Sequence, residues 1–213
     1  MKKCFAGVDV GKTNIRFAIT ENTPELKAFT KRAYERGSAA EMQRQIIEGI
    51  DHVLETSGCR DEALSGIGIG VPAVVDRETG TILWGPEWDF LEGVSLTEPV
   101  AAHYKVPVTS DVDTVMATWG EQWAGTGQTC QRFAVLTWGT GLGAGLVIGG
   151  HVVENPHNLF PEFGHMRVSE DDWLCKCGAR GCADALVCSS GIAKHAKLAL
   201  ATEKRTILRE ICG

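Results

Sequence analysis

The chain has 213 residues, of which 44% are hydrophobic and 23% are charged, and its formal net charge is −6 at pH 7. This composition is typical of a globular protein with one large or two small domains. Apolar runs stay well below the ~20 residues that span a membrane, the N-terminus turns polar too early for a signal peptide, and the acidic balance disfavours a nucleic-acid partner. We therefore expect a cytoplasmic protein without a membrane or nucleic-acid partner.

In the first part of the chain, apolar runs flank one helical pattern. Three runs have the length and composition of strands: residues 4–10, 15–19 and 65–71. The first two enclose a turn-like stretch and predict a hairpin. Ser38-Ala-Ala-Glu41 is a capping box, and apolar residues follow it at helical spacing until Gly58, a typical C-terminal stop.

The second part of the chain continues the alternation. Further strands are predicted at residues 106–109, 133–138 and 144–148, and helices at residues 96–104, 114–123 and 190–211. Glycine-rich residues 139–143 join two of these strands into a second hairpin. Strands that alternate with helices, and two hairpins with Gly and Thr at the turn, indicate an α/β fold with a duplicated plan. We expect two domains, residues 1–112 and 113–213.

The turns of both hairpins carry residues suited to phosphate. Such turns offer backbone N–H groups and hydroxyls to phosphate oxygens, and Asp9 can hold Mg²⁺ through water. Glycines let the backbone approach an anion closely, although each turn taken alone can equally be an ordinary hairpin turn. The candidate phosphate-binding residues are Asp9, Gly11, Lys12, Thr13 and Asn14 in the first hairpin, and Gly139, Thr140, Gly141 and Gly143 in the second.

An acidic cluster lies where a predicted strand gives way to a helix, at Ser110-Asp111-Val-Asp113. Asp111 can accept the proton of a hydroxyl group that attacks a phosphoryl group. The alternative is an N-cap aspartate, which is common at such a boundary.

One histidine and three cysteines lie within 18 positions, in Glu162-Phe-Gly-His165 and Cys175-Lys-Cys177-Gly-Ala-Arg-Gly-Cys182. Thiolates and an imidazole suit tetrahedral Zn²⁺, and the glycines allow sharp turns. The alternative is that these cysteines are reactive or merely buried. The other five cysteines, at positions 4, 59, 130, 188 and 212, are expected to be buried small hydrophobic residues.

These motifs, in this order, resemble those of the ROK family (repressors, open reading frames, kinases), and the resemblance covers residues 6–195. It implies an actin-like ATPase (ribonuclease H-like) fold with two lobes, of which the second is incomplete. It implies phosphoryl transfer from Mg-ATP to a hexose, at the 6-OH, with Asp111 as the base. It also implies a structural Zn²⁺ on His165, Cys175, Cys177 and Cys182, and sugar contacts from Ser110, Glu162, His165 and Asp184.

The chain departs from the usual family pattern at four of these positions. Lys12 stands where glycine is usual, Ser110 and Asp113 stand where asparagine is usual, and Asp184 replaces glutamate. The motifs do not name the hexose. Family members often form dimers or tetramers, so a homo-oligomer is among the expectations.

Two alternatives to the kinase follow from the same resemblance. The first alternative is a sugar-responsive repressor. Such family members carry a helix-turn-helix domain ahead of the first hairpin, and we expect none here because Asp9 of the first hairpin is already at position 9. The second alternative is an inactive protein that binds sugar and zinc but not ATP. It is suggested because the chain has only one glycine after Gly191 and lacks the glycine loop that contacts adenine in family kinases.

Overall fold

The structure is a computed structural model, and it describes residues 3–35, 37–59, 64–85, 88–153, 162–170, 173–202, 205 and 207–212. The chain forms two compact units, residues 1–133 with 146–160 and residues 134–145 with 161–213. This division runs through one hairpin, and the lobe boundary that we expect between residues 112 and 113 stays a prediction. Within the described ranges, no helix combines the length and the apolar composition needed to cross a membrane.

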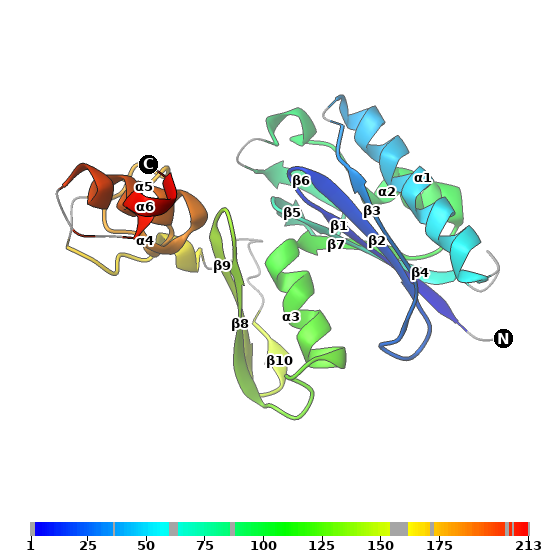
Figure 1. Ribbon diagram of the computed structural model, residues 1–213. Helices are drawn as coiled ribbons and strands as arrows, with labels where there is room; N and C mark the ends of the chain where they lie inside the picture. The colour runs from blue at the N-terminus through cyan, green and yellow to red at the C-terminus, as the bar shows by residue number, and fades with distance from the viewer. Residues whose placement is uncertain are drawn as a thin grey trace. The chain divides into compact units, whose positions relative to one another are not determined.

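A five-stranded sheet forms the centre of the first unit (Figure 1). In chain order its strands are β1 (Cys4–Val10), β2 (Asn14–Thr20), β3 (Leu26–Ala33), β4 (Leu64–Val71) and β7 (Val108–Val112). Their order in the sheet is β3-β2-β1-β4-β7. β2 is antiparallel to both its neighbours, whereas β1, β4 and β7 are parallel, so the carboxyl ends of these three meet at one edge of the sheet.

Helices cover both faces of this sheet. Figure 1 shows α1 (Ala39–Ser57) and α2 (Thr97–Tyr104) on one face and α3 (Asp113–Ala124) on the other. α1 begins and ends as predicted, because Ser38 caps the Glu41 N–H group at 3.2 Å and Gly58 adopts the left-handed conformation. The buried residues of α1 pack in one core with β2, through Met42, Ile46, Ile50, Val53 and Leu54 on the helix and Ile15, Phe17 and Ile19 on the strand.

The first unit contains elements that the sequence analysis missed. These are β3, the 3-10 helix η2 (Asp89–Leu91), and the short hairpin of β5 (Val74–Asp76) and β6 (Thr81–Trp84). β3 is an edge strand with three charged residues and no buried one, so its sequence lacks the apolar alternation typical of a strand. β7 begins two residues later than predicted and ends at Val112, which places Asp111 inside the strand.

A second, three-stranded sheet has the order β10-β9-β8. Its strands are β8 (Arg132–Trp138), β9 (Leu142–Ile148) and β10 (His151–Val152). In the first unit, Val147 and Val152 of this sheet pack against Val115 of α3. The glycine tip, which we define as residues 139–141 between β8 and β9, belongs to the second unit.

The helices of the second unit are η3 (Phe163–His165), α4 (Ala183–Val187), α5 (Ser189–Ala201) and α6 (Leu208–Cys212). The single helix predicted over residues 190–211 is wrong, because α5 ends at Ala201 and α6 starts at Leu208. The intervening Thr-Glu-Lys-Arg-Thr has no apolar residue that could continue the buried face. α4 has five residues, too few for a helical period to show in the sequence.

The expectation that the scattered cysteines are buried small hydrophobic residues holds for some of them and not for others. Cys4 at the start of β1 and Cys59 just beyond α1 form a disulfide, because the connection through α1 returns the chain to the start of the strand. Cys130 is exposed. Cys188 is free and buried, as predicted, and the side chain of Cys212 lies outside the described residues.

Gly49 leaves room for the ring of Phe17 against α1. A Cβ atom at Gly49 would lie 2.1 Å from the Phe17 ring, far inside van der Waals contact. Gly49→Ala should therefore lower the free energy of unfolding by about 1–3 kcal/mol through overpacking, despite the better helix propensity of alanine. The measurement is urea unfolding followed by circular dichroism.

Gly120→Ala is the matched control for this substitution. Gly120 lies inside α3, and a Cβ atom there meets nothing within 4 Å. This variant should gain up to about 1 kcal/mol, because alanine loses less backbone entropy than glycine when a helix forms. Equal effects of the two substitutions would contradict the packing argument.

Candidate functional site

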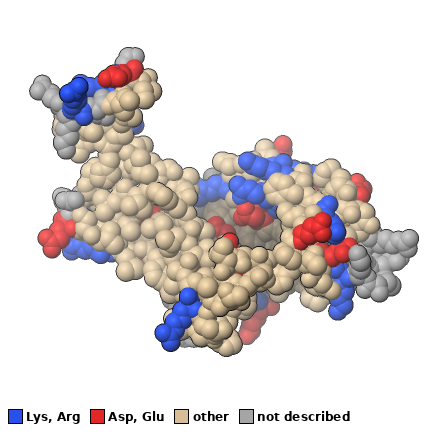
Figure 2. All heavy atoms as spheres, turned by 60° about the horizontal axis from the view of Figure 1, so that its bottom comes forward, with Lys and Arg blue, Asp and Glu red and all other residues tan. Residues whose placement is uncertain are grey.

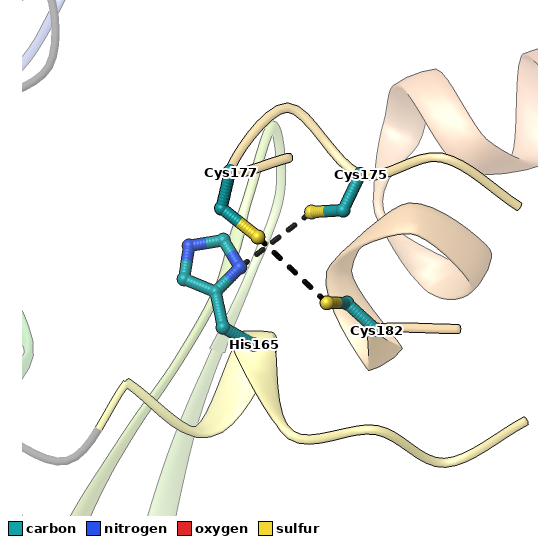
Figure 3. Close-up of side chains that lie close together, drawn as sticks. All are labelled: His165, Cys175, Cys177 and Cys182. Atoms are coloured by element: carbon teal, nitrogen blue, oxygen red, sulfur yellow. Dashed lines mark hydrogen bonds between the residues drawn. The ribbon is translucent and has the colours of Figure 1, made fainter. Parts of the chain in front are cut away.

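Four side chains converge in the second unit, as Figure 3 shows for His165, Cys175, Cys177 and Cys182. Their ligand atoms all lie within 4.8 Å of one another. The Sγ atoms of Cys177 and Cys182 are 3.8 Å apart, and the Cys175 Sγ and His165 Nδ1 atoms are 3.6 Å apart. A tetrahedral Zn²⁺ with ~2.3 Å bonds to sulfur separates its ligand atoms by roughly 3.8 Å, so this arrangement fits that ion.

Local backbone geometry creates this convergence. We call residues 175–182 the cysteine loop. Its turn is closed by two hydrogen bonds, from the Cys175 N–H group to Ala179 O (2.8 Å) and from the Gly178 N–H group to Cys175 O (3.0 Å). Gly178 and Gly181 have positive φ angles, and a Cβ atom at Gly181 would lie 2.1 Å from the carbonyl oxygen of Ser169. Glycine is therefore required for the loop to fold back beside its own lead-in segment.

The thiols of the cysteine loop differ in acidity. The Ala179 N–H group donates a hydrogen bond to the Cys177 sulfur and lowers the pKa of that thiol. Burial, with hydrogen bonds from the neighbouring thiols, raises the pKa of Cys182 to about 11. At neutral pH the Cys182 thiol is therefore protonated when no metal is bound, and it must release its proton when it becomes a metal ligand.

Zinc affinity should rise with pH, because the metal competes with the Cys182 proton until the pH passes the raised pKa. Each thiol that is still protonated costs about tenfold in affinity per pH unit. Competition with a chromophoric chelator at pH 6, 7 and 8 measures this slope. Cys177→Ser should abolish tight binding, and the exposed Cys130→Ser should bind zinc as the unmodified chain does. A pH-independent affinity would contradict the assignment of Cys182 as a ligand.

The first hairpin places its candidate residues at the carboxyl end of β1. The Gly11 N–H group donates to Asn14 O at 2.9 Å, and a Cβ atom at Gly11 would lie 2.9 Å from the same oxygen. Thr13 and Lys12 are exposed in the turn, and the Asn14 amide donates to the Thr13 hydroxyl at 2.8 Å. The turn is therefore tight, with its polar side chains accessible.

Asp9 forms an ion pair with Arg16, which faces it across the hairpin at the paired position of β2. The sequence analysis missed Arg16, although the hairpin register alone would have placed it opposite Asp9. Both side chains are about half exposed, so the pair is open to solvent and to ligands.

Asp111 is buried and paired with Arg77. The Arg77 Nε atom lies 2.7 Å from Asp111 Oδ2, and the Val112 N–H group donates to Asp111 Oδ1 at 2.7 Å. Asp111 is not an N-cap, because α3 begins at Asp113 and its N-cap residue is Val112. Arg77 lies in the turn between β5 and β6, 34 positions before Asp111, and no sequence pattern links the two.

Register brings the two candidate carboxylates into one row of the main sheet. Gly70 of β4 pairs with Asp9 on one side and with Asp111 on the other. Neighbours across a sheet project from the same face, so both carboxylates project from the face on which a Cβ atom at Gly70 would contact Asp113 and Met116 of α3 at 3.5 Å. Two strand spacings separate their Cα atoms by about 10 Å. Ser110, the residue before Asp111, is 3% exposed, and its hydroxyl has no hydrogen-bond partner among the described residues.

The second unit holds the remaining candidates. Glu162 and Thr140 are exposed, and the Glu162 carbonyl oxygen accepts a hydrogen bond from the His165 N–H group at 2.8 Å. Gly139 and Gly141 lie in the glycine tip, where the Gly139 N–H group donates to Gly141 O at 2.9 Å. Gly143 lies in β9, because that strand begins at Leu142, two residues earlier than predicted.

Asp184 is buried at the start of α4, and both of its carboxylate oxygens have partners within the second unit. Oδ1 accepts a hydrogen bond from the Leu142 N–H group at 2.8 Å, and Oδ2 lies 3.6 Å from the Lys176 Nζ atom. Neither partner was expected from the sequence.

Known proteins resemble this chain over most of its length. The sequence matches the ROK family over residues 5–212. The chain belongs to the ROK family. It is 31% identical to a glucokinase of Thermotoga maritima over 87% of this chain and 57% of that protein, and 27% identical to a xylose repressor of Caldicellulosiruptor bescii over 84% of this chain and 45% of that protein.

A solved ROK relative is a glucokinase from Streptomyces griseus in complex with glucose and AMPPNP. It is 30% identical and superposes with a TM-score of 0.77, over 93% of this chain and 62% of that one. The ROK chain described here thus has the actin-like ATPase (ribonuclease H-like) fold expected from the sequence. It spans between 45% and 62% of the length of these three proteins.

Proposed function

We propose that the ROK chain carries the phosphate-binding and base-bearing part of an ATP-dependent hexose kinase. One observation carries this proposal: Asp9 and Asp111 flank Gly70 in one row at the carboxyl edge of the parallel strands. Phosphoryl transfer needs one carboxylate near the metal and phosphates and another near the attacking hydroxyl, which this row supplies. The glucokinase relatives support the choice of a sugar as acceptor.

In the proposed reaction, the sugar 6-OH attacks the γ-phosphorus atom of ATP and ADP leaves. Asp111 accepts the hydroxyl proton, so the products are a sugar phosphate and ADP. Asp9 would hold Mg²⁺ through water, and that ion would neutralise charge on the phosphates. Lys12 and the backbone of both turns would contact phosphate oxygens, together with Thr13 and Thr140.

Sugar contacts are assigned by the family resemblance and by accessibility. We assign them to Ser110, Glu162 and His165. The Ser110 hydroxyl is buried and makes no hydrogen bond among the described residues, but consecutive residues of a strand project to opposite faces, so its assignment rests on the family resemblance. A structural Zn²⁺ would order His165 through the ligand set of Figure 3. Because the reaction uses ATP and a free hexose, we place the protein in the cytoplasm.

Asp111→Asn should lower sugar-dependent ATP turnover by about 10²–10⁴-fold, because the amide cannot accept the proton. The assay couples ADP release to a chromophore, with Mg-ATP and a panel of hexoses. Asparagine has nearly the same shape, so circular dichroism and zinc content should not change. Full activity of this variant would show that Asp111 is not the base.

Arg77 should act by holding the Asp111 carboxylate in one orientation. Arg77→Ala is expected to lower kcat about tenfold or more with little change in KM for the sugar, because a misplaced base slows the chemical step. Arg77→Lys should recover part of kcat, since it restores the charge but not the planar guanidinium group. The exposed Arg132→Ala is the control. A change confined to KM would assign Arg77 to sugar binding.

The two alternatives make different predictions. An inactive sugar-binding protein would bind glucose in calorimetry and show no affinity for Mg-AMPPNP. A repressor function is favoured by the xylose repressor relatives. Figure 2 shows acidic side chains close to basic ones, and the chain has a net charge of −6, which is unlike the strongly basic surface typical of a DNA-binding protein.

A further inference from the structure

Three sets of hydrogen bonds join the glycine tip and its two flanking residues, Trp138 and Leu142, to the segment that follows the cysteine loop. The Leu142 N–H group donates to Asp184 Oδ1 at 2.8 Å. The Trp138 indole N–H group donates to Val187 O at 2.6 Å. The Ser189 N–H and hydroxyl groups both donate to Gly139 O, at 2.9 and 2.8 Å. All of these atoms belong to the second unit, so the tip and the start of α4 and α5 form one local assembly.

Asp184 is the buried member of this assembly. The residue is 4% exposed, whereas Trp138 is 69% exposed and Ser189 is also exposed. A buried carboxylate that accepts a hydrogen bond from a backbone N–H group makes a stronger contact than an exposed neutral pair. Its neighbours also fit closely, because a Cβ atom at Gly141 would lie 3.3 Å from Asp184 Oδ1.

The same residue is tied to the candidate zinc ligands. Asp184 follows Cys182 by two positions, and Cys182 is the N-cap residue of α4. Its second oxygen faces Lys176, which lies between Cys175 and Cys177. The position of the Asp184 carboxylate therefore depends on how the cysteine loop is held, and a metal ion on its three thiolates would fix that loop.

We propose that Asp184 is a positioning residue that couples the cysteine loop to the glycine tip, and that it is not a sugar ligand in this chain. Its carboxylate is engaged at both oxygens, and it is one methylene shorter than the glutamate usual at this position. Zinc binding then orders the backbone of residues 139–142, which the proposed function assigns to ATP phosphates. The inference deepens that proposed function, and its structural part can be measured without ATP or sugar.

The test is amide hydrogen exchange at Leu142 in the zinc-loaded full chain, resolved by NMR. Asp184→Ala should speed exchange at Leu142 about tenfold or more while one equivalent of zinc stays bound. The substitution removes the carboxylate oxygen that accepts the hydrogen bond of the Leu142 N–H group. Asp184→Asn keeps an acceptor oxygen and should restore most of the protection. Removing zinc from the unmodified chain with a chelator should also speed exchange at this amide.

Glu170→Ala is the matched control, because it removes an exposed carboxylate from the segment that leads to the cysteine loop and should not alter Leu142 exchange. Unchanged exchange in zinc-loaded Asp184→Ala would overturn the proposal. If Asp184→Ala loses zinc, the test passes to Asp184→Asn. Leu142 exchange in Asp184→Asn that is as fast as in the zinc-free unmodified chain would also overturn the proposal.

Glucose titration by calorimetry separates the two roles. Loss of glucose binding in Asp184→Ala with normal Leu142 exchange would make Asp184 a direct sugar ligand and contradict the positioning role. Kinase activity is a separate outcome. The chain could show no turnover while its Leu142 exchange still responds to zinc and to Asp184→Ala. That result would contradict the proposed function and support the coupling.

Discussion

The register of three parallel strands is the constraint on which the proposed catalytic centre depends. β1 and β7 each pair with β4, and this places Asp9 and Asp111 on either side of Gly70 in a single row. A shift of one residue in either pairing would turn one carboxylate to the opposite face. The buried core resists such a shift, because alternate residues of β1 and β4, such as Val8 and Ile69, are buried in it.

Around this row the structure adds cationic partners that hold the two carboxylates. Arg16 reaches Asp9 across a hairpin, and Arg77 reaches Asp111 from a turn that is distant in the sequence. The two pairs differ in environment, since Asp111 is buried and Asp9 is half exposed. This difference suits the proposed roles, because a base must keep one orientation whereas a metal-binding carboxylate must exchange its partner for a hydrated ion.

The second unit joins the candidate metal ligands to the glycine tip, the proposed phosphate turn, through a few short contacts. The cysteine loop ends at Cys182, α4 starts directly after it, and Asp184 on that helix holds the Leu142 N–H group beside the glycine tip. Glycines make this closeness sterically feasible, since a side chain at Gly164 would lie 2.3 Å from the carbonyl oxygen of Leu142. The candidate metal ligands and the proposed phosphate turn therefore lie on two segments that a hydrogen bond joins, from the Leu142 N–H group to Asp184 Oδ1.

The sequence by itself determined the α/β class, the family, most of the strands that carry polar motifs and the four clustered metal-ligand candidates. These features are local: a hairpin turn, a capping box and a Cys-x-Cys pair fix their own geometry within a few residues. Only the tertiary structure decided the partners of Asp111 and Asp184, the disulfide of Cys4 and Cys59, and the charged edge strand β3. The Arg77 partner of Asp111, the Leu142 partner of Asp184 and the disulfide join segments far apart in the chain, and their contacts are set by sheet register and packing, which no short pattern of residues records. β3 is close to β2 in the sequence, but its charged residues do not show the apolar alternation of a strand.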